Sequence, residues 1–513
     1  MTSTCPPSRS TPTDRPKPTP KRWWSWKRGA LSIHPATLLV SLCAAVGMAA
    51  CATPAPPMQG PLPEPPASTP SAAQVARQVD VVGAKGVLGP QRREQVIQTA
   101  AAQGSADLLK RHLAAMAGVG DVDLFANNDA RLLIDGPATF EAMFATIQKA
   151  RRQILLESYI IEDAEVARKL AELLIQRRQQ GVKVAVIYDA IGSLSTQEAY
   201  FDRMRQAGIA ICAFNPVNPL KSRRYHDITE RDHRKILVVD NDVGFTGGIN
   251  ISAVYSSGSG SFGGGSFGGG KSRKKLADAS KEEQQRGWRD TMIQVRGPAV
   301  QALHDMVLQT WKQQACEGAL EALPPPPGGA GQQLMRIVPS TPQDKENRIY
   351  TLLLGSIRAA QRSVYLTMAY FAPGQDMVDA LTAAAERGVD VQLILPSKSD
   401  FSPVMHAGRS HYERLLKSGV KIHELQDAVL HAKTAVIDGV VSTVGSSNMD
   451  WRSFVHNNEV NAVVLGEDFG SAMTVMFLKD RSASRTIDLD TWKHRPLLQR
   501  GKEYFSSLLE HWW

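Results

Sequence analysis

The chain has 513 residues, of which 43% are hydrophobic and 21% are charged. This length accommodates two or three domains, and this composition excludes a fibrous or largely disordered protein. The formal net charge is +9, but residues 1–51 contribute +6 of it through seven basic side chains and one acidic side chain. The rest of the chain is only weakly basic, so no nucleic-acid partner is expected.

Residues 1–51 are predicted to be a lipoprotein-type leader. The basic stretch KRWWSWKR precedes an apolar run over residues 36–50 that ends in Cys51. This run is shorter than the roughly 20 residues that a membrane-spanning helix needs. Its ending resembles a bacterial lipoprotein signal, in which Cys51 becomes the acylated first residue. We therefore expect a membrane-associated protein of the bacterial cell envelope, lipid-anchored through Cys51 and facing the periplasm. The alternatives are that the leader is an uncleaved membrane anchor, or that it is neither a lipoprotein signal nor an anchor.

Residues 52–91 are predicted to form a Pro/Ala-rich tether, and residues 92–125 a helical lead-in. Outside the leader only two cysteines occur, Cys212 and Cys316. They could form one disulfide in an oxidising compartment, or none. No C-x-x-C spacing indicates a metal site, and neither a metal nor another cofactor is expected.

The remainder of the chain is an internal duplication. In residues 126–322 a helix pattern leads into QILLESYI, a second helix and GVKVAVIYD; in residues 336–513 the same order recurs with RSVYLTMAYF and GVDVQLILP. Apolar strands that alternate with amphipathic helices predict α/β halves whose sheets are covered on both faces. The Pro- and Gly-rich residues 323–335 are predicted to link the halves.

One segment of the first half breaks the repeat. Residues 256–286 are rich in Gly and Ser and then in charged residues, which predicts a surface loop without a core. Its basic cluster could touch anionic lipid headgroups, although a solvated spacer is the favoured interpretation. The cluster consists of Lys271, Arg273, Lys274 and Lys275.

The motif H-x-K-x4-D occurs twice, and the second histidine comes 198 residues after the first. In a strand, residues two apart point to the same face. Each half therefore offers one imidazole and one ammonium group to a common pocket. The residues are His233, Lys235 and Asp240 in the first copy and His431, Lys433 and Asp438 in the second, with Asn250 and Asn448 each 17 residues after its histidine.

These groups suit a reaction at a phosphodiester. A neutral imidazole is a nucleophile near pH 7, and an imidazolium can protonate a leaving alkoxide. The lysines can neutralise the phosphate without a metal, and the side-chain amides of Asn250 and Asn448 can donate to its oxygens. For Asp240 and Asp438, which end the motif strands, a structural role in the local turn is favoured over a direct chemical one.

The paired motifs resemble those of the phospholipase D superfamily. The strings GGINI, GWRDTMIQVRGPAV and GSSNMDWRSFVHNNE resemble its bacterial cardiolipin synthase branch, and the likeness covers roughly residues 126–510. The resemblance implies two similar α/β-sandwich halves related by a pseudo-twofold axis, with a single active site at their interface.

The resemblance also implies roles for individual residues. His233 would form a phosphohistidine, while His431 would act as the acid and then activate the acceptor; the sequence alone leaves this order open. Ser446 matches a phosphate contact of the family, and Gly248 stands at the corresponding place in the first half. Glu459 and Asp290 would each orient the histidine of the opposite half, with Asp290 harder to align because of the Gly-rich segment.

The function implied by the resemblance is that of a cardiolipin synthase-like phosphatidyltransferase. A phosphatidyl group would pass from a phospholipid donor through His233 to phosphatidylglycerol. Transfer and hydrolysis share the covalent intermediate, so a phospholipase D is the alternative, followed by a superfamily nuclease and a non-enzymatic lipid-anchored scaffold. The expected partners are phospholipid substrates and the membrane surface, which Trp512 and Trp513 could contact unless they close a helix onto the core.

Overall fold

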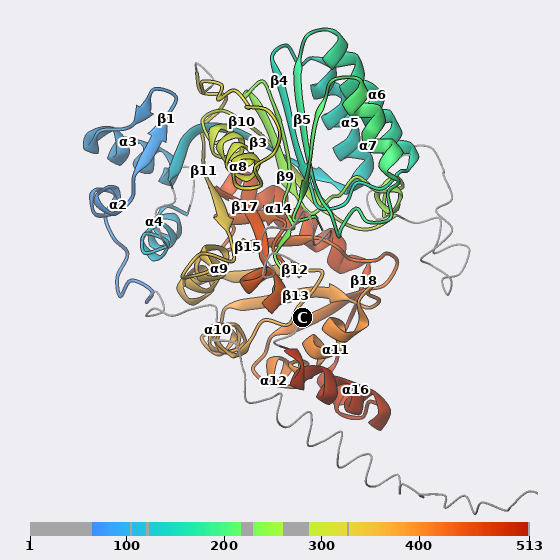
Figure 1. The fold of residues 1–513 in the computed structure, drawn as a ribbon. Helices are drawn as coiled ribbons and strands as arrows, with labels where there is room; N and C mark the ends of the chain where they lie inside the picture. The colour runs from blue at the N-terminus through green and yellow to red at the C-terminus, as the bar shows by residue number, and fades with distance from the viewer. Residues whose placement is uncertain are drawn as a thin grey trace, which may run out of the picture. The chain divides into compact units, whose positions relative to one another are not determined.

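The computed structural model describes residues 64–102, 105–119, 123–216, 229–259, 287–325 and 328–510. These residues belong to one compact unit that spans Pro54–Trp513 (Figure 1). The predictions for the leader with Cys51, for the Gly-rich residues 260–286 and for Trp512 and Trp513 lie outside the described residues. Among the described residues, no helix combines the length and apolarity needed to cross a membrane.

The first half is a seven-stranded sheet in the order β6-β5-β4-β8-β9-β10-β3. The pairs among β4, β5 and β6 are parallel and the others are antiparallel. The helices α5, α6 and α7 pack on one face, where Phe140 and Leu170 meet Leu156 and Val186 (Figure 1). The elements are β3 (Leu124–Ile134), α5 (Asp135–Gln148), β4 (Gln153–Ser158), α6 (Glu165–Gln179), β5 (Lys183–Asp189), α7 (Glu198–Gln206), β6 (Ala210–Phe214), β8 (Lys235–Val239), β9 (Val243–Gly247) and β10 (Thr291–Arg296).

The second half repeats this sheet in the order β14-β13-β12-β15-β16-β17-β11, with β18 added beyond β14. The helices α9 and α10 pack on its outer face. The elements are β11 (Gln333–Ser340), α9 (Arg348–Ala359), β12 (Ser363–Met368), α10 (Gln375–Glu386), β13 (Asp390–Pro396), α11 (Ser402–Ser410), α12 (Tyr412–Lys417), β14 (Lys421–Leu425), β15 (Lys433–Ile437), β16 (Val441–Gly445), β17 (Asn457–Leu465), β18 (Ser484–Thr486), α15 (Leu489–Lys493) and α16 (Leu497–Leu508).

The two halves share a central hydrophobic core. It contains Val295 and Leu303 from the first half and Val460 and Met473 from the second, with side chains from α8 (Val300–Gln313) and α14 (Glu467–Ser482). The backbones also meet, because β3 pairs with β11 and the short strand β7 (Arg231–Asp232) pairs with β17. The predicted fold of two similar α/β halves is confirmed, and burial of this shared core holds them together.

The predicted tether is too long. Residues 71–91 contain α2 (Ala72–Gln78), β1 (Val81–Gly83), β2 (Gly86–Val87) and the start of α3 (Pro90–Ala101), and α4 (Ala106–Ala115) follows. The Ser71 hydroxyl and the Gln74 side chain form a capping box that starts α2. Val75 and Val81 are fully buried, and β1 pairs with β3. The apolar residues of this segment therefore pack into the core, and the segment is not the extended tether that was predicted.

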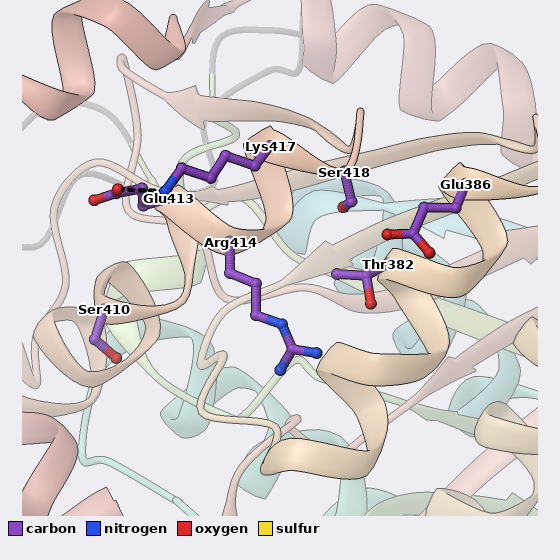
Figure 2. Close-up of a pocket in the computed structure, with 7 residues that line it drawn as sticks. All are labelled: Thr382, Glu386, Ser410, Glu413, Arg414, Lys417 and Ser418. Carbon is purple, nitrogen blue, oxygen red and sulfur yellow. Dashed lines mark ion pairs between the residues drawn. The ribbon is translucent and has the colours of Figure 1, made fainter.

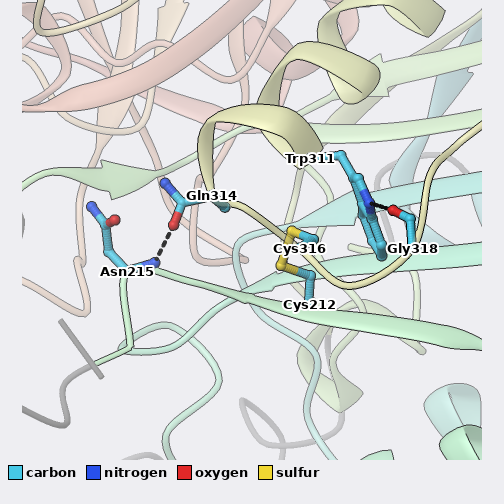
Figure 3. Close-up of a disulfide and its surroundings, with 6 residues drawn as sticks. All are labelled: Cys212, Asn215, Trp311, Gln314, Cys316 and Gly318. Carbon is cyan, nitrogen blue, oxygen red and sulfur yellow. Dashed lines mark hydrogen bonds between the residues drawn. A yellow bond between two sulfur atoms is a disulfide. The ribbon is translucent and has the colours of Figure 1, made fainter. Parts of the chain in front are cut away.

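The structure pairs the two cysteines that the sequence left open. Cys212 on β6 and Cys316 just after α8 form a disulfide whose Cα atoms are 5.6 Å apart (Figure 3). Neighbouring hydrogen bonds hold the same junction: the Asn215 backbone donates to the Gln314 side chain at 3.0 Å, and the Trp311 indole donates to Gly318 O at 2.8 Å (Figure 3). The disulfide thus ties the edge of the first sheet to the helix of the shared core.

Candidate active site

Both motif histidines stand immediately before buried strands. Lys235 begins β8 and Lys433 begins β15, and every residue of these two apolar strands is buried. His233 and His431 are 8% and 6% exposed, so each is nearly enclosed. The strands hold the lysines, and the histidines lie just before the strands begin, where the two halves meet.

His233 is held by a carboxylate of the opposite half. Its Nδ1 lies 3.0 Å and 3.1 Å from the two carboxylate oxygens of Glu459 on β17. The hydroxyl of Ser446 donates to Glu459 at 2.5 Å, and the amide of Asn457 donates at 3.2 Å. Because the carboxylate takes up Nδ1, Nε2 is the nitrogen that can act on a substrate.

His431 is held in the reciprocal way by the first half. Its Nδ1 lies 2.7 Å from the Asp290 carboxylate and 3.1 Å from the Tyr255 hydroxyl. The ammonium of Lys433 also lies 3.0 Å from this nitrogen. Asp290 was harder to align than Glu459 because of the Gly-rich segment, and the structure places it beside His431.

The backbone repeats the same symmetry. The N–H of His233 donates to Asn458 O at 3.0 Å, and the N–H of His431 donates to Arg289 O at 2.8 Å. Each carbonyl belongs to the residue that precedes the opposing acid. The two motif copies also share one electrostatic environment, because the charge of Lys433 contributes to lowering the pKa of His233.

Burial sets the protonation of this site. It lowers the pKa of His233 to about 4 and that of Lys235 to about 7, and it also lowers the pKa of His431 and of Lys433. Burial alone would raise the pKa of Glu459, but the interactions with His233 and Lys235 outweigh it and leave that pKa below its usual value. At neutral pH the site therefore holds neutral imidazoles beside an ionised Glu459.

The two motif aspartates face away from the histidines. Asp240 accepts backbone N–H groups of residues 151–153 at 2.7–2.9 Å, and Asp438 accepts those of residues 361–363 at 2.7–3.2 Å. Asp438 also lies 2.9 Å from Nε2 of His112. Both aspartates have positive φ, 56° and 53°. These contacts favour the structural role in fixing the turn and the start of the neighbouring strand.

The polar residues after the motifs differ between the halves. Asn250 accepts from Ile160 N at 3.1 Å, whereas the buried side-chain oxygen of Asn448 has no hydrogen-bond partner among the described residues. A Cβ at Gly248 would lie 2.2 Å from an Asp290 oxygen. The first half therefore has no room for the counterpart of Ser446, which explains the asymmetry that the sequence displayed.

Four aromatic residues that the sequence analysis did not single out surround the histidines. The Tyr159 ring centroid lies 5.0 Å from that of His233 and 5.1 Å from the Lys235 ammonium. Around His431, the centroids of Trp288, Tyr255 and Tyr370 lie at 5.3, 5.9 and 6.3 Å. Trp288 lies within GWRD and Tyr255 follows Asn250 by five residues, so proximity to the motifs was the available signal. These rings contribute to the burial of the two imidazoles.

The sequence analysis also did not single out Arg289. Its guanidinium is fully buried and donates to both carboxylate oxygens of Asp480 on α14, at 2.8 Å and 2.7 Å. It also donates to Asp290 O at 2.5 Å. This bidentate pair joins the halves directly beside the acid that orients His431.

A hollow of about 460 Å³ lies elsewhere, between α10 and α12 (Figure 2). It contains none of the motif residues; of its charged side chains, Lys417 pairs with Glu413 at 2.9 Å and Arg414 pairs with Asp379 at 2.5 Å. Across the described ranges, no group of three or more His, Cys, Asp or Glu side chains is arranged to hold a metal ion. The hollow is lined by Thr382, Glu386, Ser410, Glu413, Arg414, Lys417 and Ser418.

Known proteins share both the sequence and the fold. The family described as "Cardiolipin synthase, PLD-like domain" matches residues 143–257 and 353–481. The chain is 36% identical over 402 residues to a cardiolipin synthase of Geobacillus thermodenitrificans, which covers 78% of this chain and 74% of that protein. It is 34% identical over 363 residues to cardiolipin synthase A of Pseudomonas aeruginosa, which covers 70% of this chain and 68% of that protein.

Among solved structures, phosphatidylserine synthase from Haemophilus influenzae aligns with a TM-score of 0.55 at 12% identity, over 78% of this chain and 99% of that one. At this identity the likeness concerns the fold alone. The sequence identity to the curated relatives, over most of both chains, carries the assignment. The chain belongs to the cardiolipin synthase family of phospholipase D-like enzymes.

Proposed function

We propose that this protein is a phosphatidyltransferase that joins a phosphatidyl group to phosphatidylglycerol to make cardiolipin. The observation that carries the proposal is the reciprocal pairing of His233 with Glu459 and of His431 with Asp290. Each half supplies one histidine and the acid for the other, so one complete set of groups exists only where the halves meet. The cardiolipin synthases among the relatives supply the choice of substrates.

In the first step, Nε2 of His233 attacks the phosphorus of the donor lipid. A P–N bond forms and the P–O bond to the leaving alcohol breaks, while protonated His431 gives its proton to the departing oxygen. Lys235, Lys433 and the side chain of Asn448 stabilise the charge on the non-bridging oxygens. The anionic phosphate favours the protonated form of His431 when substrate is bound.

In the second step, the acceptor lipid replaces the departed alcohol. Neutral His431 takes the proton of a phosphatidylglycerol hydroxyl as its oxygen attacks phosphorus. The P–N bond breaks and His233 is regenerated. A phospholipase D would use water here, so the burial of the two imidazoles among aromatic residues supports the transferase.

The transfer is tested with purified protein and labelled phosphatidylglycerol in vesicles, with and without added alcohol. Cardiolipin and free glycerol are the expected products, whereas phosphatidic acid alone would establish the hydrolase. A labelled covalent adduct should accumulate in His431→Ala and be absent from His233→Ala; the opposite pattern would reverse the two roles. His494→Ala, an exposed histidine at the end of α15, is the matched control and should retain activity.

For location, we propose that the protein is anchored by acylation of Cys51 and faces the periplasm. The Cys212–Cys316 disulfide supports an oxidising compartment. Palmitate labelling of cells should mark the protein and should be lost in Cys51→Ala. Absence of label, with an unchanged size of the protein, would contradict the anchor.

A further inference from the structure

The helix α16 exposes its apolar side chains and buries a charged one, which is the reverse of an ordinary surface helix in a soluble protein. Its buried residue is Glu503, which is 1% exposed. Its large apolar residues face outward: Leu497 is 80% exposed, Leu498 75% and Phe505 67%. A surface helix normally packs its apolar stripe on the core, so this orientation needs a physical reason.

Two buried acids are hydrogen-bonded in and just beyond α16. Glu503 accepts from Arg495 at 2.8 Å and from Gln499 at 2.9 Å. One residue beyond the helix end, Glu510 lies 3.1 Å from His411 and accepts from Gly374 N at 3.2 Å. The Glu510 contacts join the end of α16 to the residues that precede α10 and α12, whereas the Glu503 contacts lie within α16 and the segment just before it. The buried polar groups are therefore satisfied while the apolar side faces outward.

The outward side forms a continuous apolar stripe with helical spacing. Positions 497, 498, 501, 504, 505 and 508 follow the i, i+1, i+4, i+7, i+8, i+11 pattern of one helix face. Gly501 lies within the stripe, and the other members are exposed. We call this set the α16 apolar face; its large members are Leu497, Leu498, Tyr504, Phe505 and Leu508.

The exposed charges of α16 itself have one sign. Arg500 and Lys502 are exposed, whereas both acidic residues of 497–510 are buried; the partly exposed Glu413 of α12 lies within electrostatic reach of Arg500. An apolar stripe on a helix that exposes cations and no acid of its own matches a bilayer that contains anionic phospholipid: the stripe enters the acyl boundary and the cations meet the headgroups.

The helix is also connected to the candidate active site. It packs on α11, and Figure 1 shows the two helices side by side. Immediately before α11, Phe401 is 42% exposed and Asp400 accepts from the Tyr370 hydroxyl at 2.7 Å. The Tyr370 ring in turn lies 6.3 Å from that of His431. One short helix, α11, therefore lies between the exposed apolar face and the residues beside His431.

We propose that α16 is an interfacial helix whose apolar face enters the surface of an anionic phospholipid bilayer and so brings the active site to its lipid substrate. The role as a substrate-delivery element rests on the proposed function, since the same bilayer holds the substrate. The bilayer contact itself is a separate property and is measured separately.

The contact is tested by hydrogen exchange of the full-length protein with and without vesicles of 30% phosphatidylglycerol in phosphatidylethanolamine. The amides of residues 497–508 should exchange at least 10-fold more slowly with these vesicles. This local readout does not depend on whether the N-terminal anchor also holds the membrane. Unchanged exchange would overturn the proposal and turn attention to a protein partner.

The functional consequence is tested in Leu498→Ser/Phe505→Ser. The ratio of turnover on vesicles to turnover on dispersed short-chain phosphatidylglycerol should fall at least 10-fold. Val87→Ser is the matched control, because Val87 is 65% exposed but lies on β2 in the N-terminal segment, and its ratio should not change. An unchanged ratio in the α16 variant overturns the delivery role, whereas absence of transfer by the unaltered protein on either substrate overturns the proposed function instead.

Discussion

At the scale of single residues, burial of the motif cations makes the candidate site sensitive to pH. Burial lowers the pKa of Lys235 to about 7, so the free enzyme loses this positive charge as the pH rises through 7. On the acid side His233, with a pKa of about 4, remains a neutral nucleophile down to that pH. We expect kcat/KM, which reports the free enzyme, to be highest between about pH 5 and 7 and to fall above 7.

The measurement is kcat/KM for transfer from vesicle phosphatidylglycerol between pH 4 and 9. Lys235→Arg keeps its charge throughout this range, so its residual activity should lose the part of the alkaline decline that comes from Lys235 and keep only the part that comes from His431. Lys183→Arg, at an exposed lysine on β5, should keep the original profile. A value of kcat/KM that stays constant up to pH 9 would contradict the assignment of Lys235 to phosphate binding.

A second residue-scale prediction concerns the Tyr255 hydroxyl. Burial raises the pKa of Tyr255 well above its usual value, so the hydroxyl stays neutral, and its oxygen can accept from the Nδ1–H of His431, 3.1 Å away, alongside the Asp290 carboxylate. Tyr255→Phe should lower kcat about 5-fold, corresponding to the loss of a hydrogen bond of about 1 kcal/mol, because Asp290 still holds the ring.

The matched control is Tyr200→Phe. Tyr200 is also buried, but its hydroxyl donates to Ala167 O at 2.9 Å in the core of the first half, so kcat should stay unchanged. Steady-state kinetics on vesicles distinguish the two variants. Equal kcat values in both would show that the Tyr255 hydroxyl does not position His431.

At the scale of elements, the motif aspartates join each motif strand to the start of its neighbour. Asp438 is fully buried, while Asp240 is partly exposed. Asp438→Asn should therefore lower the free energy of unfolding by about 3 kcal/mol, and Asp240→Asn by about 1 kcal/mol, through weakened charge-assisted hydrogen bonds. Urea unfolding measures both. Native stability combined with lost turnover would instead favour a direct chemical role.

At the scale of the whole molecule, the buried Arg289–Asp480 pair joins the halves beside the site. Asp480→Asn leaves the buried Arg289 with only the longer contact to Asp135, at 3.5 Å, so it should lower the free energy of unfolding by about 3 kcal/mol. The control is Asp242→Asn, whose Arg296 pair is 51% exposed on both sides and should contribute less than about 1 kcal/mol. Urea unfolding under oxidising conditions tests this, and similar midpoints for the two variants would contradict it.

The shared core explains why the site depends on the intact molecule. The proposed catalytic groups come from both halves, and the two sheets are held together by side chains of α8 and α14. The position of Asp290 relative to His431 therefore depends on packing across the whole interface.

The sequence by itself determined the fold class, the duplication and the chemical groups of the site. Strand and helix periodicity and the spacing of His233 to Lys235 are local properties, so they can be read without knowing the fold. The family resemblance supplied the pairing of Glu459 and Asp290 with opposite histidines, and the structure provides the distances.

Only the tertiary structure decided the pairing of Cys212 with Cys316, the burial of residues 71–91, the Arg289–Asp480 contact and the outward turn of α16. Each depends on which distant surfaces meet, and composition cannot report this: a Pro/Ala-rich segment still packs when a neighbouring strand offers it a partner. Leu498 and Glu503 show the same limit. Their polarity predicts a buried leucine and an exposed glutamate, but Leu498 is exposed and Glu503 is buried against Arg495. The type and spacing of side chains can be read from the sequence, whereas the burial of each side chain depends on how the whole core assembles.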